Sequence, residues 1–97
     1  MYITCVRHTV QDYDRWKVAF DCNAPLLTKA GALGTWIVQI GGNPCDVAII
    51  NTWPSAKHWV DFCALHEAPE NKGKLKTKED GGVIGEPVFF GGEVMVS

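Results

Sequence analysis

This sequence has no basic excess, no long apolar run and no closely spaced cysteine pair, and each absence excludes a class of function. Nine lysines and arginines stand against eleven aspartates and glutamates, for a net charge of −2. This disfavours nucleic acid as a partner, because phosphate binding needs a basic surface. No run approaches the roughly 18 consecutive apolar residues of a membrane span, and no charged leader precedes the first strand-like run. We therefore expect a cytoplasmic protein with neither a membrane nor a nucleic-acid partner.

The four cysteines are spaced too widely for a common metal site. They are separated by 17, 23 and 18 residues, with no Cys-x-x-Cys pair and no histidine at zinc-finger spacing. A phosphate-binding glycine loop and a Ser-His-Asp order are also absent. With 46% hydrophobic residues, the chain can form a core without disulfides. The sequence thus predicts free thiols, no metal and no cofactor.

The 97 residues form one expected domain, 1–97, with a pattern of strands and helices along it. β-branched and aromatic residues predict strands over 2–9, 33–40, 45–53 and 83–96, the last interrupted at Gly91-Gly92. Helical spacing from Tyr13 predicts a first helix to about residue 29, bent or broken at Pro25. A second helix is expected after Pro54-Ser55.

A weak internal repeat organises these elements. A shift of 43 residues sets Val6–Thr9 against Ile49–Thr52, and Trp16 against Trp59. Two such halves predict an α+β, ferredoxin-like βαββαβ sandwich, with an antiparallel four-stranded sheet and both helices on one face. Within it we expect the first and third strands as parallel neighbours, with His8 and Asn51 side by side. Two helices leave the other sheet face uncovered, which predicts a homodimer.

Four segments carry a resemblance to a known family. They are ITCVRHTVQDYDRWKVAFD at 3–21, GALG at 31–34, TWPS at 52–55 and GVIGEPVFF at 82–90. Together they resemble the antibiotic biosynthesis monooxygenase-like family of the dimeric α/β-barrel superfamily, over about residues 2–91. The resemblance implies a dimeric α/β-barrel with a ligand cavity between each sheet and its own helices. For some members it also implies cofactor-independent oxidation of aromatic polyketides by dioxygen.

Other branches of the superfamily degrade haem, isomerise or cleave small molecules, or have no known reaction. Haem-degrading members resemble this chain around Trp53-Pro54-Ser55, but carry a tryptophan near Phe62 and a haem-ligating histidine near Lys72. This chain has neither, unless the alignment shifts to His66. The resemblance therefore argues against haem degradation.

Three residues are candidates for catalysis: His8, Asn51 and His66. A histidine titrates near neutral pH, so His8 is a potential general base, or else a hydrogen-bonded residue at a strand end. His66 shares a helix face with Trp59 and is either a site residue or a partner of the helix dipole. Asn51 interrupts an apolar strand face and must bond to a ligand, the backbone or water. His58 is expected in solvent.

The remaining candidates bind substrate: Arg7, Trp36, Trp53, Trp59 and Phe62. Arg7 offers a cation to an enolate or carboxylate, and an interface ion pair explains it equally well. The aromatic residues are ring platforms or packing residues.

The leading functional hypothesis is a homodimeric small-molecule enzyme of the cofactor-independent monooxygenase type. A phenolic or enolic aromatic substrate loses a proton to His8 or His66, while Asn51 and Arg7 stabilise the oxyanion. A non-catalytic ligand-binding or structural dimer remains an alternative, as does a lyase or isomerase with the same fold.

Overall fold

The structure is a computed structural model that describes residues 1–67 and 81–95, except for the side chains of residues 65–67. The element order confirms the βαββαβ prediction. The elements are β1 (Tyr2–Val10), α1 (Tyr13–Lys29), β2 (Gly34–Gln39), the 3-10 turn η1 (Ile40–Gly42), β3 (Asp46–Trp53), α2 (Ala56–Glu67) and β4 (Val83–Glu93). No helix in the described residues is long and apolar enough to span a membrane.

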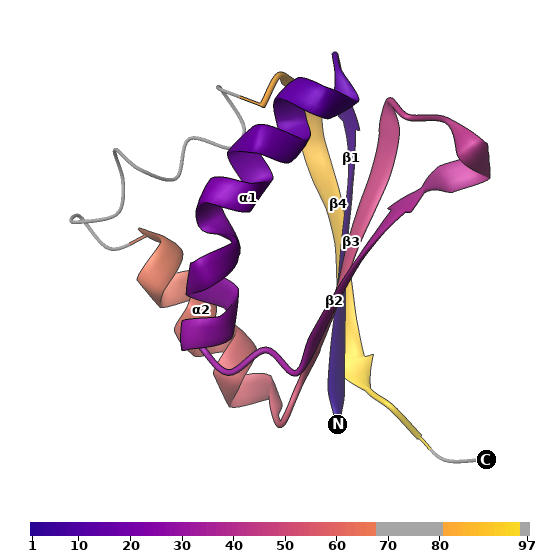
Figure 1. The fold of residues 1–97 in the computed structure, drawn as a ribbon. Helices are drawn as coiled ribbons and strands as arrows, with labels where there is room; N and C mark the ends of the chain where they lie inside the picture. Colours follow the sequence, from indigo (N-terminus) through magenta and orange to yellow (C-terminus); the bar gives the residue numbers. More distant parts are fainter. Residues whose placement is uncertain (68–80, 96–97) are drawn as a thin grey trace.

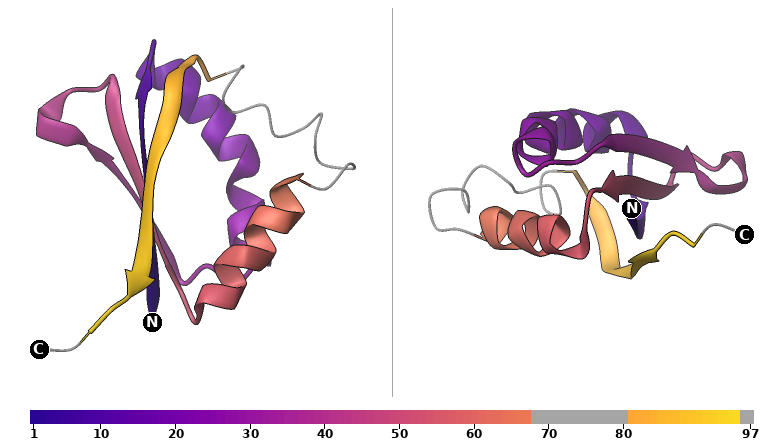
Figure 2. Two further views of the ribbon diagram at one scale, coloured as in Figure 1. Left: turned by 180° about the vertical axis from the view of Figure 1, so that it is seen from behind. Right: turned by 90° about the horizontal axis from the view of Figure 1, so that it is seen from below.

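The four strands form one sheet in the order β2-β3-β1-β4, and every neighbouring pair is antiparallel. Both helices lie on the same side of this sheet, and none of the described elements covers the opposite side (Figures 1 and 2). The predicted fold class, a ferredoxin-like α+β sandwich with helices on one face, is therefore confirmed.

The expected parallel pairing of the first and third strands is wrong. The α1 crossover returns the chain so that β2 runs in the direction of β1, and the following hairpin then reverses β3. The register pairs Asn51 with Thr4, and His8 with Val47. His8 and Asn51 consequently lie toward opposite ends of the central strand pair.

Helix α1 begins at a well-formed N-cap and buries one stripe of side chains. Asp12 is extended, and its Oδ1 accepts a hydrogen bond from the Arg15 backbone N–H at 3.1 Å. The buried residues, spaced three or four apart, are Trp16, Phe20, Asn23 and Leu27. The sequence suggested that the helix bends or breaks at Pro25. The helix instead continues without a break to Lys29. Proline has no backbone N–H, so the carbonyl one turn earlier lacks its helical hydrogen bond. Because Pro25 is exposed, this carbonyl faces water.

Strand β4 continues through Gly91-Gly92 to Glu93, so the predicted interruption there is wrong. The irregularity lies earlier in the strand. Arg7 pairs with Val88, but Thr9 pairs with Ile84, so residues 85–87 of β4 stand opposite His8 alone. Gly85 has a φ of +71°, a backbone conformation that few other residues adopt. This β-bulge leaves His8 without a backbone partner on β4.

The two faces of the sheet differ in what covers them. The helix-facing side contributes to a core cluster of Val10, Trp16, Phe20, Leu27, Val47 and Trp53. The uncovered side, called the open face below, carries exposed apolar residues. They are Trp36, Val38, Ile84, Val88 and Phe90.

Candidate functional site

Two hydrogen-bonded pairs lie on the helix-facing side, near the start of β1. The indole N–H of Trp53 donates to Thr4 Oγ1 at 3.0 Å, and both residues are fully buried. Beside them, the Thr35 hydroxyl donates to Asn51 Oδ1 at 2.7 Å. Asn51 is paired in register with both Thr4 and Thr35, so the four side chains form one polar layer across three strands. The Asn51 carbonyl oxygen is therefore used within the chain.

His8 lies on the same side of the sheet, four positions further along β1. Its Nε2 is buried and has no hydrogen-bond partner in the described part of the chain. Burial lowers the pKa of His8 below its ordinary value of 6.5, because desolvation disfavours the charged imidazolium. The ring is therefore neutral near pH 7 and able to accept a proton.

The ring of Trp16 packs directly against His8. The two ring centres are 5.5 Å apart and the planes meet at 67°, an edge-to-face contact. Trp16 is fully buried, and its Nε1 also has no hydrogen-bond partner among the described residues. Two buried nitrogens in touching rings that both lack a partner in the described part of the chain are unusual, since buried polar groups are almost always satisfied. The sequence placed Trp16 on the buried face of its helix but gave no signal that its N–H is unpaired.

A cluster of aromatic side chains joins α2 to the sheet. Trp59 stacks on Phe89 with ring centres 5.2 Å apart and planes at 8°, and it contacts Trp53 and Phe62 at 5.8 and 5.7 Å. The structure thus brings together three of the predicted substrate-binding residues: Trp53, Trp59 and Phe62. Phe89 was missed, because its strand neighbour Phe90 faces the other way and the sequence does not distinguish the two.

His8 and Asn51 cannot act on the same atom. Thr4, the register partner of Asn51, is four residues from His8 along β1, about 13 Å at roughly 3.3 Å per residue. The predicted arrangement, in which His8 removes a proton and Asn51 stabilises the same oxygen, therefore does not fit this geometry.

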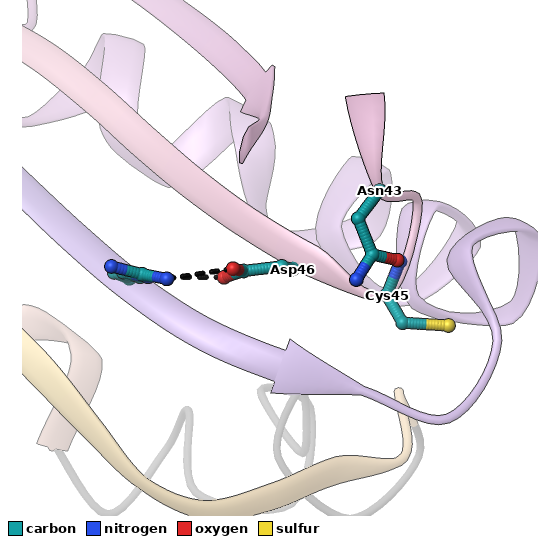
Figure 3. Close-up of polar contacts among 4 residues, drawn as sticks. Asn43, Cys45 and Asp46 are labelled. Carbon is teal, nitrogen blue, oxygen red and sulfur yellow. Dashed lines mark hydrogen bonds and ion pairs between the residues drawn. The ribbon is translucent and has the colours of Figure 1, made fainter. Parts of the chain in front are cut away.

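Arg7 and Trp36 are not part of this interior. Both alternate with helix-facing neighbours and lie on the open face, where Trp36 is 53% exposed. Arg7 forms a two-point ion pair with Asp46 at the start of β3, with Nε–Oδ1 and Nη2–Oδ2 distances of 3.0 and 2.7 Å (Figure 3). The arginine lowers the pKa of Asp46, mainly through this hydrogen bonding. The sequence predicted that Arg7 either binds substrate or forms an interface ion pair. The geometry matches an ion pair, but both partners belong to the same chain.

The side chain of His66 and the whole of Lys72 lie outside the described residues. His58 is not in solvent as expected. Its Nδ1 is 2.8 Å from Ser55 Oγ, and its ring lies against Gly31. The four cysteines, which all lie within the described residues, form no disulfide bonds, and the same residues include no group of three or more metal-ligating side chains.

Comparison with known proteins supports the fold. Neither protein-family models nor curated proteins match the sequence. Among solved structures, one described as an antibiotic biosynthesis monooxygenase from Nitrosomonas europaea is 16% identical with a TM-score of 0.76, over 99% of this chain and 100% of that one. SnoaB, a cofactor-independent oxygenase from Streptomyces nogalater, is 11% identical with a TM-score of 0.75, over 99% and 95%.

A third similar structure is a variant of MhuD with two manganese protoporphyrin IX groups bound per active site. It is 12% identical with a TM-score of 0.71, over 100% of this chain and 97% of that one. The resemblance read from the sequence is thus supported by full-length matches at low identity. This chain has the ferredoxin-like fold of the antibiotic biosynthesis monooxygenases.

Proposed function

We propose that this protein is a small-molecule enzyme of the cofactor-independent monooxygenase type, acting on a phenolic or enolic aromatic substrate. The observation that carries the proposal is the state of His8. Its Nε2 is buried and has no partner among residues 1–67 and 81–95, and the ring is neutral at physiological pH because burial lowers its pKa. A neutral histidine with a free ring nitrogen in a water-poor site is well suited to act as a general base.

The chemistry that suits this site begins with removal of a proton from the substrate. His8 takes the proton of a phenolic or enolic hydroxyl, which leaves an electron-rich anion. For an anthrone-like substrate the overall reaction is R₂CH₂ + O₂ → R₂C=O + H₂O. The substrate supplies all the electrons, one oxygen atom enters the product and the other leaves as water. No external reductant is then required.

The aromatic cluster of Trp53, Trp59, Phe62 and Phe89 provides flat apolar surface on the same side of the sheet. Phe89 is 48% exposed, so the cluster reaches the surface between α2 and β4. Stacked rings of this kind favour planar aromatic ligands. The similarity in fold to SnoaB, which is described as a cofactor-independent oxygenase, supports the proposed reaction type.

The active form is proposed to be a homodimer formed through the open face. Five exposed apolar side chains lie on this one sheet face, and exposed apolar patches rather than scattered residues mark sites of protein–protein contact. A second copy covers the same patch by two-fold symmetry, which also gives the small core further buried area. The Arg7–Asp46 pair then lies within or beside that interface.

Oxygen uptake with a panel of anthrone-like phenols tests the enzyme. We expect uptake in the wild type and a loss of about 10²-fold or more in His8→Phe, as for removal of a general base. The matched control is His58→Phe, which removes a histidine of α2 that is already hydrogen-bonded to Ser55. No uptake across the panel overturns the oxygenase proposal. Substrate turnover without oxygen points instead to a lyase or isomerase using the same base.

A ligand-binding or structural dimer is the second candidate, favoured by one observation. The polar layer of Thr4, Trp53, Asn51 and Thr35 is bonded within the chain, as expected of a structural core. This candidate predicts that ligands bind without chemical change. Recovery of unaltered phenols after prolonged aerobic incubation supports it, and product formation excludes it.

A further inference from the structure

We infer that Nε2 of His8 and Nε1 of Trp16 together form a binding site for the hydroxyl group of an aromatic ligand. The inference rests on the proposed function for the aromatic nature of the ligand. It adds Trp16 as a second polar residue that recognises the ligand, and it can be tested without turnover.

The first argument is the geometry of the two rings. Their centres are 5.5 Å apart, and both nitrogens are buried with no partner in the described residues. The contact between the two rings thus brings both polar atoms into one small region of the interior, and the inferred ligand hydroxyl is the group that satisfies them there.

The second argument is the chemistry of the two nitrogens. An indole N–H only donates, while the Nε2 of a neutral histidine accepts when its proton is on Nδ1. The group that fits both must accept one hydrogen bond and donate another. A hydroxyl does this, whereas an ether oxygen only accepts. The pair therefore selects a phenol or enol over its methyl ether.

The third argument is the local backbone. The β-bulge places residues 85–87 of β4 opposite His8, so the ladder between β1 and β4 is interrupted at this residue. Bulges are found more often beside functional sites, where they re-aim side chains. By contrast, the Thr4–Trp53 and Asn51–Thr35 pairs lie where the strands are paired regularly, and their oxygens are already used. The unpaired polar atoms of His8 and Trp16 thus coincide with the irregular part of the sheet.

The test compares 2-naphthol with 2-methoxynaphthalene, two probes of similar shape that differ in the ability to donate a hydrogen bond. Affinities are measured by calorimetry under nitrogen, so that oxidation cannot contribute. We expect the naphthol to bind at least about fivefold more tightly, the effect of one buried hydrogen bond. His8→Phe and Trp16→Phe should each remove most of this preference. Trp36→Phe, which changes an indole on the open face, should preserve it.

Indole N–H resonances of ¹⁵N-labelled protein report the contact directly. The chain has four tryptophans, and the signal lost in Trp16→Phe identifies Trp16. Naphthol should shift this signal more than the other three. His8→Phe keeps the indole, so the naphthol preference can be tested even if Trp16→Phe fails to fold.

Three results overturn the inference: equal affinity for the two probes, binding of neither, or a Trp16 signal unmoved at saturation. The result is separable from the proposed function. A naphthol preference without oxygen uptake upholds the site and contradicts the oxygenase. Oxygen uptake that Trp16→Phe leaves unchanged upholds the oxygenase and contradicts the site.

Discussion

The indole N–H of Trp53 donates to the hydroxyl of Thr4 across the β1–β3 pair at 3.0 Å, and neither residue has any exposed surface. In a fully buried setting, the hydrogen bond matters mainly through what its loss leaves behind. An unsatisfied buried donor costs more than the bond itself contributes. Loss of the Thr4–Trp53 pair is therefore expected to destabilise the interior between β1, β3 and the helices.

Thr4→Val tests this contact, because it keeps the shape of the side chain and removes only the acceptor. We expect the free energy of unfolding to fall by about 1–3 kcal/mol, since Trp53 Nε1 is left buried and unpaired. Thr9→Val is the control, as Thr9 lies in the same strand but is exposed, and it should change stability by about 0.5 kcal/mol or less. Both are measured by urea unfolding. Equal effects of the two substitutions contradict the assigned role.

The order of elements was predictable because each follows from a local pattern. Alternating β-branched residues indicated β1 and β3, and the spacing of Trp16 and Phe20 indicated the buried stripe of α1. The relative direction of β1 and β3 was predicted wrongly, although a hairpin between β2 and β3 requires it to be antiparallel. That error alone placed His8 beside Asn51.

The composition of the site was less predictable, for a geometric reason. Strand alternation shows that Arg7 and His8 face opposite sides, but it does not show which side the helices cover. For the same reason, the sequence does not show which residue of the pair Trp36 and Ile37, or of the pair Phe89 and Phe90, faces the helices. Only the packed structure reveals that Trp16 Nε1 has no partner among the residues it describes, because hydrogen-bond satisfaction depends on residues distant in sequence.

Stability should depend on the protonation of His8 as the pH falls below about 7. In the unfolded chain His8 takes up a proton as the pH falls through about 6.5, whereas burial lowers its pKa in the folded protein. The unfolded state then binds more protons, so the free energy of unfolding decreases as the pH is lowered. It levels off once the pH is below the pKa of His8 in the folded protein.

His8→Phe should flatten this pH dependence, and Thr9→Val should leave it unchanged. Urea unfolding at intervals of half a pH unit measures it. The Asp46 carboxylate acts in a separate window, since its pKa is already lowered from 3.8 and its contribution is lost only in stronger acid. An unchanged slope in His8→Phe contradicts a buried neutral histidine.

The proposed homodimer predicts a sharp effect of charge on the open face. Phe90 is 62% exposed in the single chain, so Phe90→Glu costs little in a monomer but buries an unpaired carboxylate in a dimer. We expect a dimeric wild type and a monomeric Phe90→Glu by sedimentation at micromolar concentration. Val18→Glu, on the exposed side of α1 with 66% exposure, is the control and should remain dimeric. A monomeric wild type contradicts the proposed assembly.

The contact between Gly31 and His58 predicts a coupled pair of substitutions. Gly31 has a φ of +100°, and a Cβ there would lie 2.9 Å from Cδ2 of His58. Gly31→Ala therefore adds a steric clash to the cost of a positive φ, which is about 1–2 kcal/mol by itself. Gly41 also has a positive φ, +62°, but no atom lies within 4 Å of the corresponding position. Gly41→Ala should thus be the milder change in thermal and urea unfolding.

In a His58→Ala background the clash is absent, so Gly31→Ala should cost less than it does in the wild type. The difference between the two costs measures the clash with His58 alone. The cost of the positive φ is the same in both backgrounds and cancels. An identical cost in the two backgrounds assigns the whole effect to backbone strain. The predicted clash with His58 is then wrong.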